Sequence, residues 1–288
     1  MKKSSILFVL IILSVQFSQA RVRYIDKNGG TGRYQTIQAG IDAAIEGDTV
    51  RILPGIYKES LTIGKNIVVQ GAGIMATTIT SDNTEQSTVT ITGGKLMWVA
   101  ITSSNNNGVN LKTATVSNCL FINCKGAGVW VSGSGAKIYN CISQGNDQGF
   151  WVGAGVNGCD LLVLNSIALW NKDRGYMVTT NSTLNARYCN AYENGNGNNN
   201  YCGGSTLSWM ECRSVNPGFS PDDWRLSNSS LLKDAGDPNI FDLDGTRSDM
   251  GYYGGPDAPL LPYITMPINY KLNPDGTIQF DMQGKVGY

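Results

Sequence analysis

Two carboxylates in this sequence stand at the same position relative to a recurring glycine. Asp147 and Asp173 each lie two residues before such a glycine, and Lys172 and Arg174 flank the second carboxylate. Two carboxylates that lie close together share a proton or a cation, and oxygen ligands of this kind suit calcium. With the two neighbouring cations they form an acid, base and cation set for β-elimination or hydrolysis of a glycan. The alternative is that each Asp caps its own turn, an ordinary use of Asp.

Aromatic side chains follow the same glycines. The phrases Gly-Val-Asn-Leu, Gly-Val-Trp-Val, Gly-Phe-Trp-Val and Gly-Tyr-Met-Val begin at Gly108, Gly128, Gly149 and Gly175. In a strand, successive side chains alternate between faces, so Trp130, Trp151 and Met177 are predicted to point outward, one above another. A sugar ring packs against such an aromatic face, and Trp130 and Trp151 are therefore candidate substrate-binding residues. The alternative is that a loop or the C-terminal tail covers them.

A second acidic cluster lies near the end of the chain. Asp242, Asp244 and Asp249 surround Arg247, and the Asp-x-Asp-Gly sequence at its start resembles the beginning of a calcium loop. The remaining spacing of an EF-hand is missing. Asp242 and Asp244 are thus candidate metal ligands, beside Asp147 and Asp173. A structural turn explains the same pattern without catalysis.

The elements that position these residues form an internal repeat. Between the glycine phrases runs a second series, Asn-Cys-Leu, Asn-Cys-Ile, Asn-Ser-Ile and Asn-Ala-Tyr, that begins at Asn118, Asn140, Asn165 and Asn190. Each unit holds short strands of period two, with no room for a helix between them. The repeat predicts an all-β parallel β-helix, a solenoid whose successive coils pair with one another and share one core.

The abundant Gly and Asn residues have a mechanical explanation in such a solenoid. Its tight corners need left-handed or strained backbone, which these two residues adopt most readily. The shared register also predicts that Leu120, Ile142, Ile167 and Tyr192, each two residues after a repeat Asn, form one buried ladder.

The rest of the chain surrounds the repeat. A basic start, an apolar run and a small-residue cleavage site indicate a secretory signal, and Ser14 and Gln16 interrupt the run too early for a membrane-spanning helix. An amphipathic segment with Ile37, Ile41, Ala44 and Ile45 on one side predicts a capping helix over 34–45. The expected divisions are a signal peptide at 1–20, an N-terminal cap at 21–48, coils at 49–216, a closing segment at 217–257 and a tail with a β-hairpin at 258–288.

Composition excludes several classes of protein. The chain has 22 basic and 22 acidic residues and no histidine. Without histidine there is no Ser-His-Asp or Cys-His nucleophile and no His-bearing zinc site. Loss of Lys2 and Lys3 with the signal leaves a slightly negative net charge. Such a charge does not favour binding to nucleic acid or to an anionic membrane. No segment is expected to insert into a membrane after signal removal.

The seven cysteines allow disulfides in an exported chain. Cys202 and Cys212 flank a Gly-Gly-Ser turn and are the first candidate pair. Cys119 and Cys141 are expected to stack as small apolar fillers.

Two stretches carry a resemblance to a known superfamily. Residues 34–44 (Tyr-Gln-Thr-Ile-Gln-Ala-Gly-Ile-Asp-Ala-Ala) and 47–59 (Gly-Asp-Thr-Val-Arg-Ile-Leu-Pro-Gly-Ile-Tyr-Lys-Glu) resemble the opening of the pectin lyase-like superfamily. Residues 242–253 look like the end of secreted bacterial right-handed β-helix proteins. The resemblance implies a right-handed parallel β-helix that works on polysaccharide, but the chain lacks the Asp, Arg and Gln motifs of the methylesterases, the Asp clusters of pectate lyases and the His of polygalacturonases.

These patterns leave three functions open. The first is a secreted or cell-surface β-helix protein that binds or processes polysaccharide. The second is a polysaccharide lyase or glycoside hydrolase acting on a uronic-acid-containing glycan, with Asp147 and Asp173 as calcium ligands or acid and base, and Lys172 or Arg174 as base. The third is a structural module of the cell surface.

Overall fold

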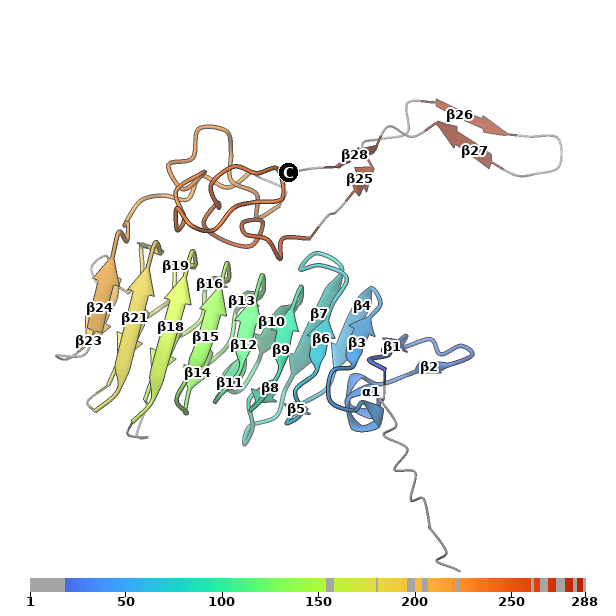
Figure 1. Ribbon diagram of the computed structural model, residues 1–288, viewed down its shortest axis with the longest axis horizontal. Helices are drawn as coiled ribbons and strands as arrows, with labels where there is room; N and C mark the ends of the chain where they lie inside the picture. The colour runs from blue at the N-terminus through green and yellow to red at the C-terminus, as the bar shows by residue number, and fades with distance from the viewer. Residues whose placement is uncertain are drawn as a thin grey trace, which may run out of the picture.

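Short strands wind into coils that stack along the long axis of the molecule (Figure 1). The computed structural model describes residues 19–153, 158–179, 181–195, 200–203, 207–220 and 223–259, and the backbone of four later strands. Nearly all of the expected signal peptide at 1–20 therefore lies outside the described residues. Within the described part, no helix has the length and apolar character needed to cross a membrane.

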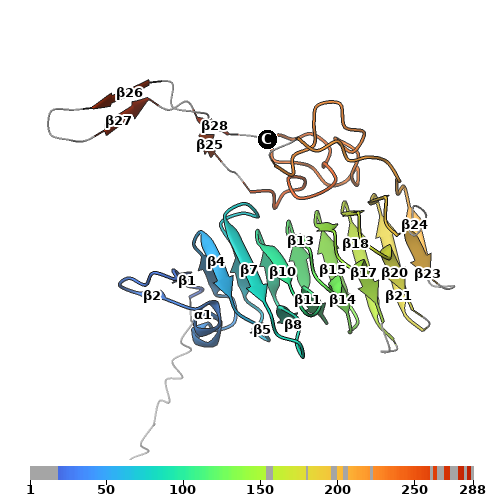
Figure 2. The ribbon, with the colours of Figure 1, turned by 180° about the vertical axis from the view of Figure 1, so that it is seen from behind.

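Three parallel sheets run along the solenoid (Figures 1 and 2). Sheet A has ten strands: β2 Arg33–Tyr34, β1 Val22–Ile25, β3 Thr49–Ile52, β6 Val68–Gln70, β9 Lys95–Met97, β12 Thr115–Ser117, β15 Ala136–Tyr139, β18 Asp160–Leu164, β21 Thr183–Arg187 and β24 Leu207–Met210. Sheet B has seven: β4 Gly55–Lys58, β7 Thr77–Ser81, β10 Ala100–Ser103, β13 Leu120–Ile122, β16 Ile142–Gln144, β19 Ile167–Leu169 and β22 Asn190–Tyr192. Sheet C has seven: β5 Leu61–Ile63, β8 Val89–Ile91, β11 Val109–Leu111, β14 Ala127–Val131, β17 Gln148–Val152, β20 Arg174–Val178 and β23 Tyr201–Gly203.

The strands after residue 259 do not join these sheets. β25 Pro262–Ile264 pairs with β28 Gly284–Val286, and β26 Asn269–Leu272 pairs with β27 Ile278–Asp281. Both pairs are antiparallel. The pairing of β26 with β27 confirms the predicted hairpin. The parallel β-helix expected from the repeat is confirmed as well.

Inward side chains of successive coils stack into one core. Val129 lies opposite Phe150 and Phe150 opposite Tyr176, and all three are fully buried. The Phe150 and Tyr176 rings stack with centroids 5.0 Å apart, and Tyr176 stacks on Tyr201 at 5.1 Å. The alternation predicted for these strands is therefore correct, and it fixes which side chains must face outward.

The N-terminal end of the solenoid is capped by a short helix. Helix α1 (Ile37–Ala43) is shorter than the segment predicted at 34–45. Ile37 and Ile41 are buried, but Ile45 is 42% exposed, so its expected place on the buried side is wrong. The helix ends at Ala43 because Ala44 has an extended backbone. The Lys65 ammonium donates hydrogen bonds to the carbonyl oxygens of Ile41 and Ala44 at this end of the helix.

Asparagine at the corner between sheets A and B is left-handed, as predicted. Asn118, Asn140 and Asn165 have φ of 46°, 49° and 50°. The repeat glycines are different: Gly149 is not left-handed, and a Cβ there would lie 2.3 Å from the Gly175 carbonyl oxygen. These glycines are therefore required by close approach of neighbouring coils and not by backbone handedness.

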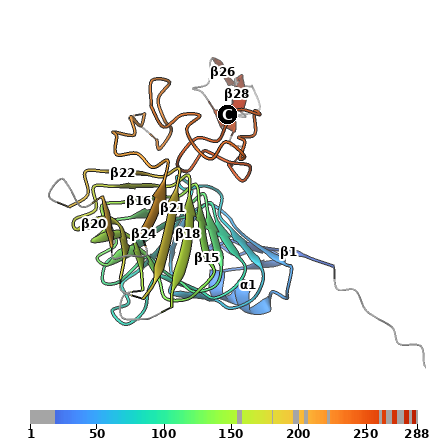
Figure 3. The same ribbon diagram turned by 60° about the vertical axis from the view of Figure 1, so that its left-hand side comes forward.

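Three of the four residues predicted to form a buried ladder stack on one another, but Tyr192 does not join them. Leu120 pairs with Ile142, and Ile142 with Ile167, but Ile167 pairs with Asn190, because Tyr192 lies opposite Leu169. The first three residues of the ladder are buried on the outside of sheet B, where they pack against Leu232, Met250 and Tyr252. The segment that contributes these residues, 217–259, lies along the side of the solenoid (Figures 1 and 3). From here on, closing segment means residues 217–259, two residues more than the expected division at 217–257.

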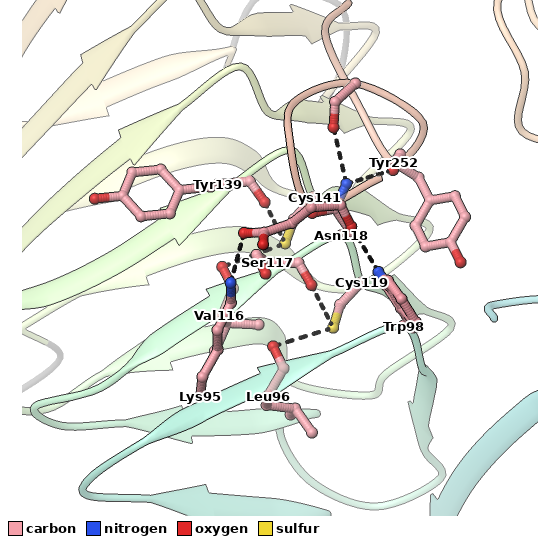
Figure 4. Close-up of polar contacts among 12 residues, drawn as sticks. Lys95, Leu96, Trp98, Val116, Ser117, Asn118, Cys119, Tyr139, Cys141 and Tyr252 are labelled. Atoms are coloured by element: carbon pink, nitrogen blue, oxygen red, sulfur yellow. Dashed lines mark hydrogen bonds and ion pairs between the residues drawn. The ribbon is translucent and has the colours of Figure 1, made fainter. Parts of the chain in front are cut away.

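The corner asparagines also hold the closing segment. The Asn118 amide donates hydrogen bonds to the carbonyl oxygens of Tyr252 (2.6 Å) and Gly254 (2.9 Å), as Figure 4 shows. Asn140 donates to the Asp249 carbonyl oxygen at 2.9 Å. Asparagine at this corner thus serves twice: its backbone forms the left-handed corner, and its side chain binds the closing segment.

The predicted disulfide between Cys202 and Cys212 is wrong, because both thiols are free. Cys119 and Cys141 do stack as buried fillers, and their thiols donate to carbonyl groups of the preceding strands (Figure 4). Cys212 instead lies beside Cys189, whose thiol donates a hydrogen bond that lowers the pKa of Cys212.

Candidate functional site

One row of side chains follows the outer face of sheet C. Asn110 pairs with Trp130, Trp130 with Trp151, and Trp151 with Met177. Neighbouring parallel strands lie about 4.8 Å apart. The structure therefore places the two candidate tryptophans on adjacent coils, pointing outward.

The two indoles are not fully open to solvent. Trp130 and Trp151 are both half-buried. Each Nε1 atom is buried, and the described part of the chain offers neither nitrogen a hydrogen-bond acceptor. A buried donor without a partner costs about 1–3 kcal/mol. Within the described residues, these two N–H groups therefore gain no hydrogen bond that would offset this cost.

The four charged candidates come together beside this row. The Asp173 N–H donates to the Asp147 carbonyl oxygen at 2.8 Å, so the two carboxylates lie on neighbouring coils. The Lys172 Nζ atom is 3.4 Å from an Asp147 oxygen, and the Arg174 Nε atom is 3.7 Å from an Asp173 oxygen. Both carboxylates are 45% exposed. Exposed ion pairs of this kind contribute about 0–1 kcal/mol to stability.

Arg174 connects the charged group to the outer row. Its Nη1 atom lies 3.0 Å from the Met177 sulfur, and its backbone pairs with Gln148 on the strand that carries Trp151. Trp130, Trp151, Asp147, Lys172, Asp173 and Arg174 thus form one surface, which we call the sheet C site.

Calcium at this site stays a prediction. In the ranges that the structure describes, no group of three or more His, Cys, Asp or Glu side chains is arranged to hold a metal ion. Asp147 and Asp173 are two carboxylates, each beside a cationic side chain. A cation bound there would have to displace Lys172 and Arg174.

One aromatic residue near the site has no place in the sequence prediction. Trp170 lies at the corner between sheets B and C, is 48% exposed and has a left-handed φ of 51°. Its indole N–H donates to the Glu193 carboxylate at 2.9 Å. An alignment of the repeats that matches residues 169–171 with 122–124 and 144–146 would have revealed this position. It places Trp170 at the corner that earlier coils fill with Asn123 and Gly145.

The second acidic cluster pins turns of the closing segment. Asp242 accepts hydrogen bonds from the backbone N–H groups of Asp249 (3.0 Å) and Gly255 (2.5 Å). Asp244 accepts from the backbone and hydroxyl of Thr246 at 2.9 and 2.7 Å. These contacts agree with the structural alternative for this cluster.

A cavity of about 340 Å³ opens beside these carboxylates. Arg225, Lys233, Asp242, Asp249 and Tyr253 line it, and the Arg225 guanidinium lies 4.8 Å above the centre of the Tyr253 ring. Burial is the largest influence on Asp249 and raises its pKa to about 6. Sequence reasoning missed the cavity because the closing segment has no repeat that would relate its residues.

Comparison with known proteins gives likeness in fold. No family model matches the sequence, and neither does any curated protein. Among solved structures, Geobacillus virus E2 ORF18 is 21% identical with a TM-score of 0.50, over 62% of this chain and 44% of that one. An identity this low shows a likeness in fold alone, and the fold of this chain is a parallel β-helix. This chain spans less than half of the length of the viral protein.

Two further solved structures show a weaker likeness to this chain. Pectate lyase Pel9A is 15% identical with a TM-score of 0.42, over 82% of this chain and 96% of that one. Pectin methylesterase PemA from Erwinia chrysanthemi is 14% identical with a TM-score of 0.42, over 75% and 77%. Identities this low carry no argument about activity, because one fold hosts many functions.

Proposed function

We propose that this β-helix protein is secreted and binds polysaccharide at the sheet C site. The observation that supports the proposal most directly is the register: Trp130 lies opposite Trp151, beside two carboxylates on neighbouring coils. The indoles offer apolar faces to sugar rings. The charged side chains offer hydrogen bonds to hydroxyl or uronate groups, either directly or through a cation on Asp147 and Asp173.

Binding without catalysis is the better match to this surface. General acid–base chemistry is most efficient where a group is withdrawn from water and tuned by its surroundings. Asp147 and Asp173 are instead nearly half exposed, and each already lies beside a cationic partner. Such groups can orient a glycan without moving protons.

The test compares tryptophans in and out of the site. Replacement of both Trp130 and Trp151 by alanine should weaken binding to the cognate glycan at least tenfold, a loss of about 1.4 kcal/mol or more. Trp209→Ala is the matched control, because Trp209 is 56% exposed and lies on β24, outside the site. Affinity electrophoresis on polygalacturonate, alginate and xylan, with and without calcium, measures the effect. Equal retention of the double variant and the control would contradict the proposal.

A second candidate function is a hydrolase or lyase reaction at the cavity of the closing segment. Asp249 favours it, since a carboxyl with a pKa of about 6 in a cavity can serve as a general acid. Reducing-sugar release and unsaturated-uronate absorbance on the same polysaccharides, for wild type and Asp249→Asn, separate an enzyme from a binding module. Activity that survives in Asp249→Asn would rule out this site.

A further inference from the structure

Trp170 occupies a backbone conformation that does not suit its side chain. The equivalent corner positions in neighbouring coils are Asn123, Gly145 and Glu193, all with positive φ. Asn and Gly tolerate this left-handed conformation, whereas a bulky side chain pays conformational strain there. The strain at Trp170 therefore needs an explanation in the contacts of its indole.

Other aromatic residues with left-handed backbone have such contacts. Trp98 (φ 60°) donates its indole N–H to the Asp257 carbonyl oxygen at 2.7 Å. Tyr188 (φ 50°) lies beneath the Arg247 guanidinium, which is 5.5 Å from its ring centre. Both side chains also pack against the apolar cluster under the closing segment. In these two cases the attachment of the closing segment offsets the strain.

Trp170 has no comparable attachment among the described residues. Trp170 is 48% exposed, and its indole N–H donates a hydrogen bond to Glu193, which is itself exposed. That bond holds the indole against the next coil without burying it. A strained aromatic residue that stays open to solvent is explained better by a ligand than by folding.

The position of Trp170 indicates which ligand. Along one coil the chain passes from Trp170 through Lys172 and Asp173 to Arg174 and Met177. The charged group of the sheet C site therefore lies between Trp170 at the corner and the outer row that contains Trp151. An extended ligand that touches all three must follow the coil around the corner.

We propose that Trp170 and Glu193 form a further saccharide subsite of the sheet C site, so that the bound glycan runs around the coil and not along the solenoid axis. The inference rests on the proposed function. One sugar ring packs on the Trp170 indole, and its hydroxyl groups donate to the Glu193 carboxylate. The expected ligand is an oligosaccharide, because contact with both Trp170 at the corner and Trp151 in the outer row requires more than one sugar ring.

The experiment compares Trp170 and Trp98, which both have a left-handed backbone. Each is replaced by Asn, which tolerates this conformation. Trp170→Asn should keep or raise the midpoint of urea unfolding, since Asn relieves the strain. Trp98→Asn should lower it, because the contact with Asp257 is lost. Binding is measured with oligosaccharides of increasing length from polygalacturonate, alginate and xylan. For wild type, affinity for the bound series should rise with chain length, and Trp170→Asn should lose at least tenfold on the long oligomers and little on the short ones.

The outcomes separate this inference from the proposed function. If Trp170→Asn destabilises the protein as much as Trp98→Asn does, the indole is structural and the inference is wrong. If Trp170→Asn binds long oligomers like wild type while the Trp130 and Trp151 double variant does not, the subsite fails and the proposed function stands. If wild type binds none of the three series, both fail.

Discussion

At the scale of single residues, the corner asparagines meet two demands at once. A left-handed backbone is costly for most side chains, and the carbonyl groups of the closing segment need a hydrogen-bond donor. Asn140 has φ of 49° and donates to the carbonyl oxygens of Asp249 at 2.9 Å and Gly251 at 3.3 Å. Glycine meets the first demand alone, and alanine meets neither.

This difference allows the two contributions to be separated at Asn140. Asn140→Gly should lower the free energy of unfolding by about 1–2 kcal/mol, through loss of the hydrogen bonds. Asn140→Ala should lower it by about 1–2 kcal/mol more, through backbone strain. Urea denaturation of the two variants measures both values. Equal stability of Asn140→Gly and wild type would show that the amide contacts contribute nothing.

Asp249 should make stability depend on pH. Its pKa is raised by burial to about 6 in the folded protein, against about 3.9 in the unfolded chain. Between about pH 4 and 6 the folded state therefore binds more protons, and the free energy of unfolding falls as pH rises through that window. After discounting for solvent screening the effect is on the order of 1 kcal/mol.

The matched variants for this prediction are Asp249→Asn and Asp244→Asn. Asn at 249 keeps an oxygen for the Asp234 N–H and removes the titration of this residue, so the fall in stability between pH 4 and 6 should become smaller. A part of the fall should remain, because burial also raises the pKa of Asp242. Hydrogen bonds from Thr246 lower the pKa of Asp244, so this residue contributes stability that is lost as pH falls. Asp244→Asn should therefore leave the fall intact or make it steeper. Unfolding by urea at pH 4.5 and pH 7 measures all three proteins.

At the scale of elements, a buried ladder of asparagines supports the strands of the sheet C site. Asn171 donates to the Ser143 carbonyl oxygen at 3.1 Å and to the Asn194 side chain at 2.7 Å, and it accepts the Asn146 N–H at 3.1 Å. The charged residues of the site follow directly after this corner. The hydrogen bonds of the ladder therefore fix the backbone position at Asn171, from which Lys172 and Asp173 follow.

Loss of one member of the ladder should loosen both fold and site. Asn171→Ala leaves several buried donors and acceptors without partners, each at a cost of about 1–3 kcal/mol. We expect the free energy of unfolding to fall by at least 3 kcal/mol, roughly two such groups, with faster amide exchange over residues 171–175. Asn185→Ala is the control, since Asn185 is half-buried on β21 of sheet A. An equal effect of both changes would mean that the ladder has no special role.

Sequence reasoning succeeded where the repeat was regular and failed where it was interrupted. The glycine phrases paired Trp130 with Trp151 correctly, because close contact between coils requires a small residue at the same place in each turn. The asparagine series failed at Asn190, since the corner that should hold an asparagine holds Tyr188, with φ of 50°. The cavity around Asp249 had no periodic signal, and its residues meet only through tertiary packing.

At the scale of the whole molecule, the solenoid buries apolar side chains on both sides of sheet B. On β13, Phe121 faces the inner core and Leu120 faces outward against the closing segment, and both are almost completely buried. The first core holds the coils together, whereas the second attaches the closing segment to them. Burial alone does not distinguish the two, but position relative to the sheet does.

Adjacent residues can therefore test whether the closing segment is a separate layer. An unpaired charge in an apolar environment costs several kcal/mol. Phe121→Asp should prevent folding, because the charge lies inside the coils. Leu120→Asp should instead release the closing segment from an intact solenoid. We expect soluble protein with the circular dichroism of β-structure, rapid proteolysis within 217–259, and glycan binding at sheet C that stays within twofold of wild type. If Leu120→Asp is as insoluble as Phe121→Asp, the closing segment is part of one cooperative core, and the solenoid does not stand without it.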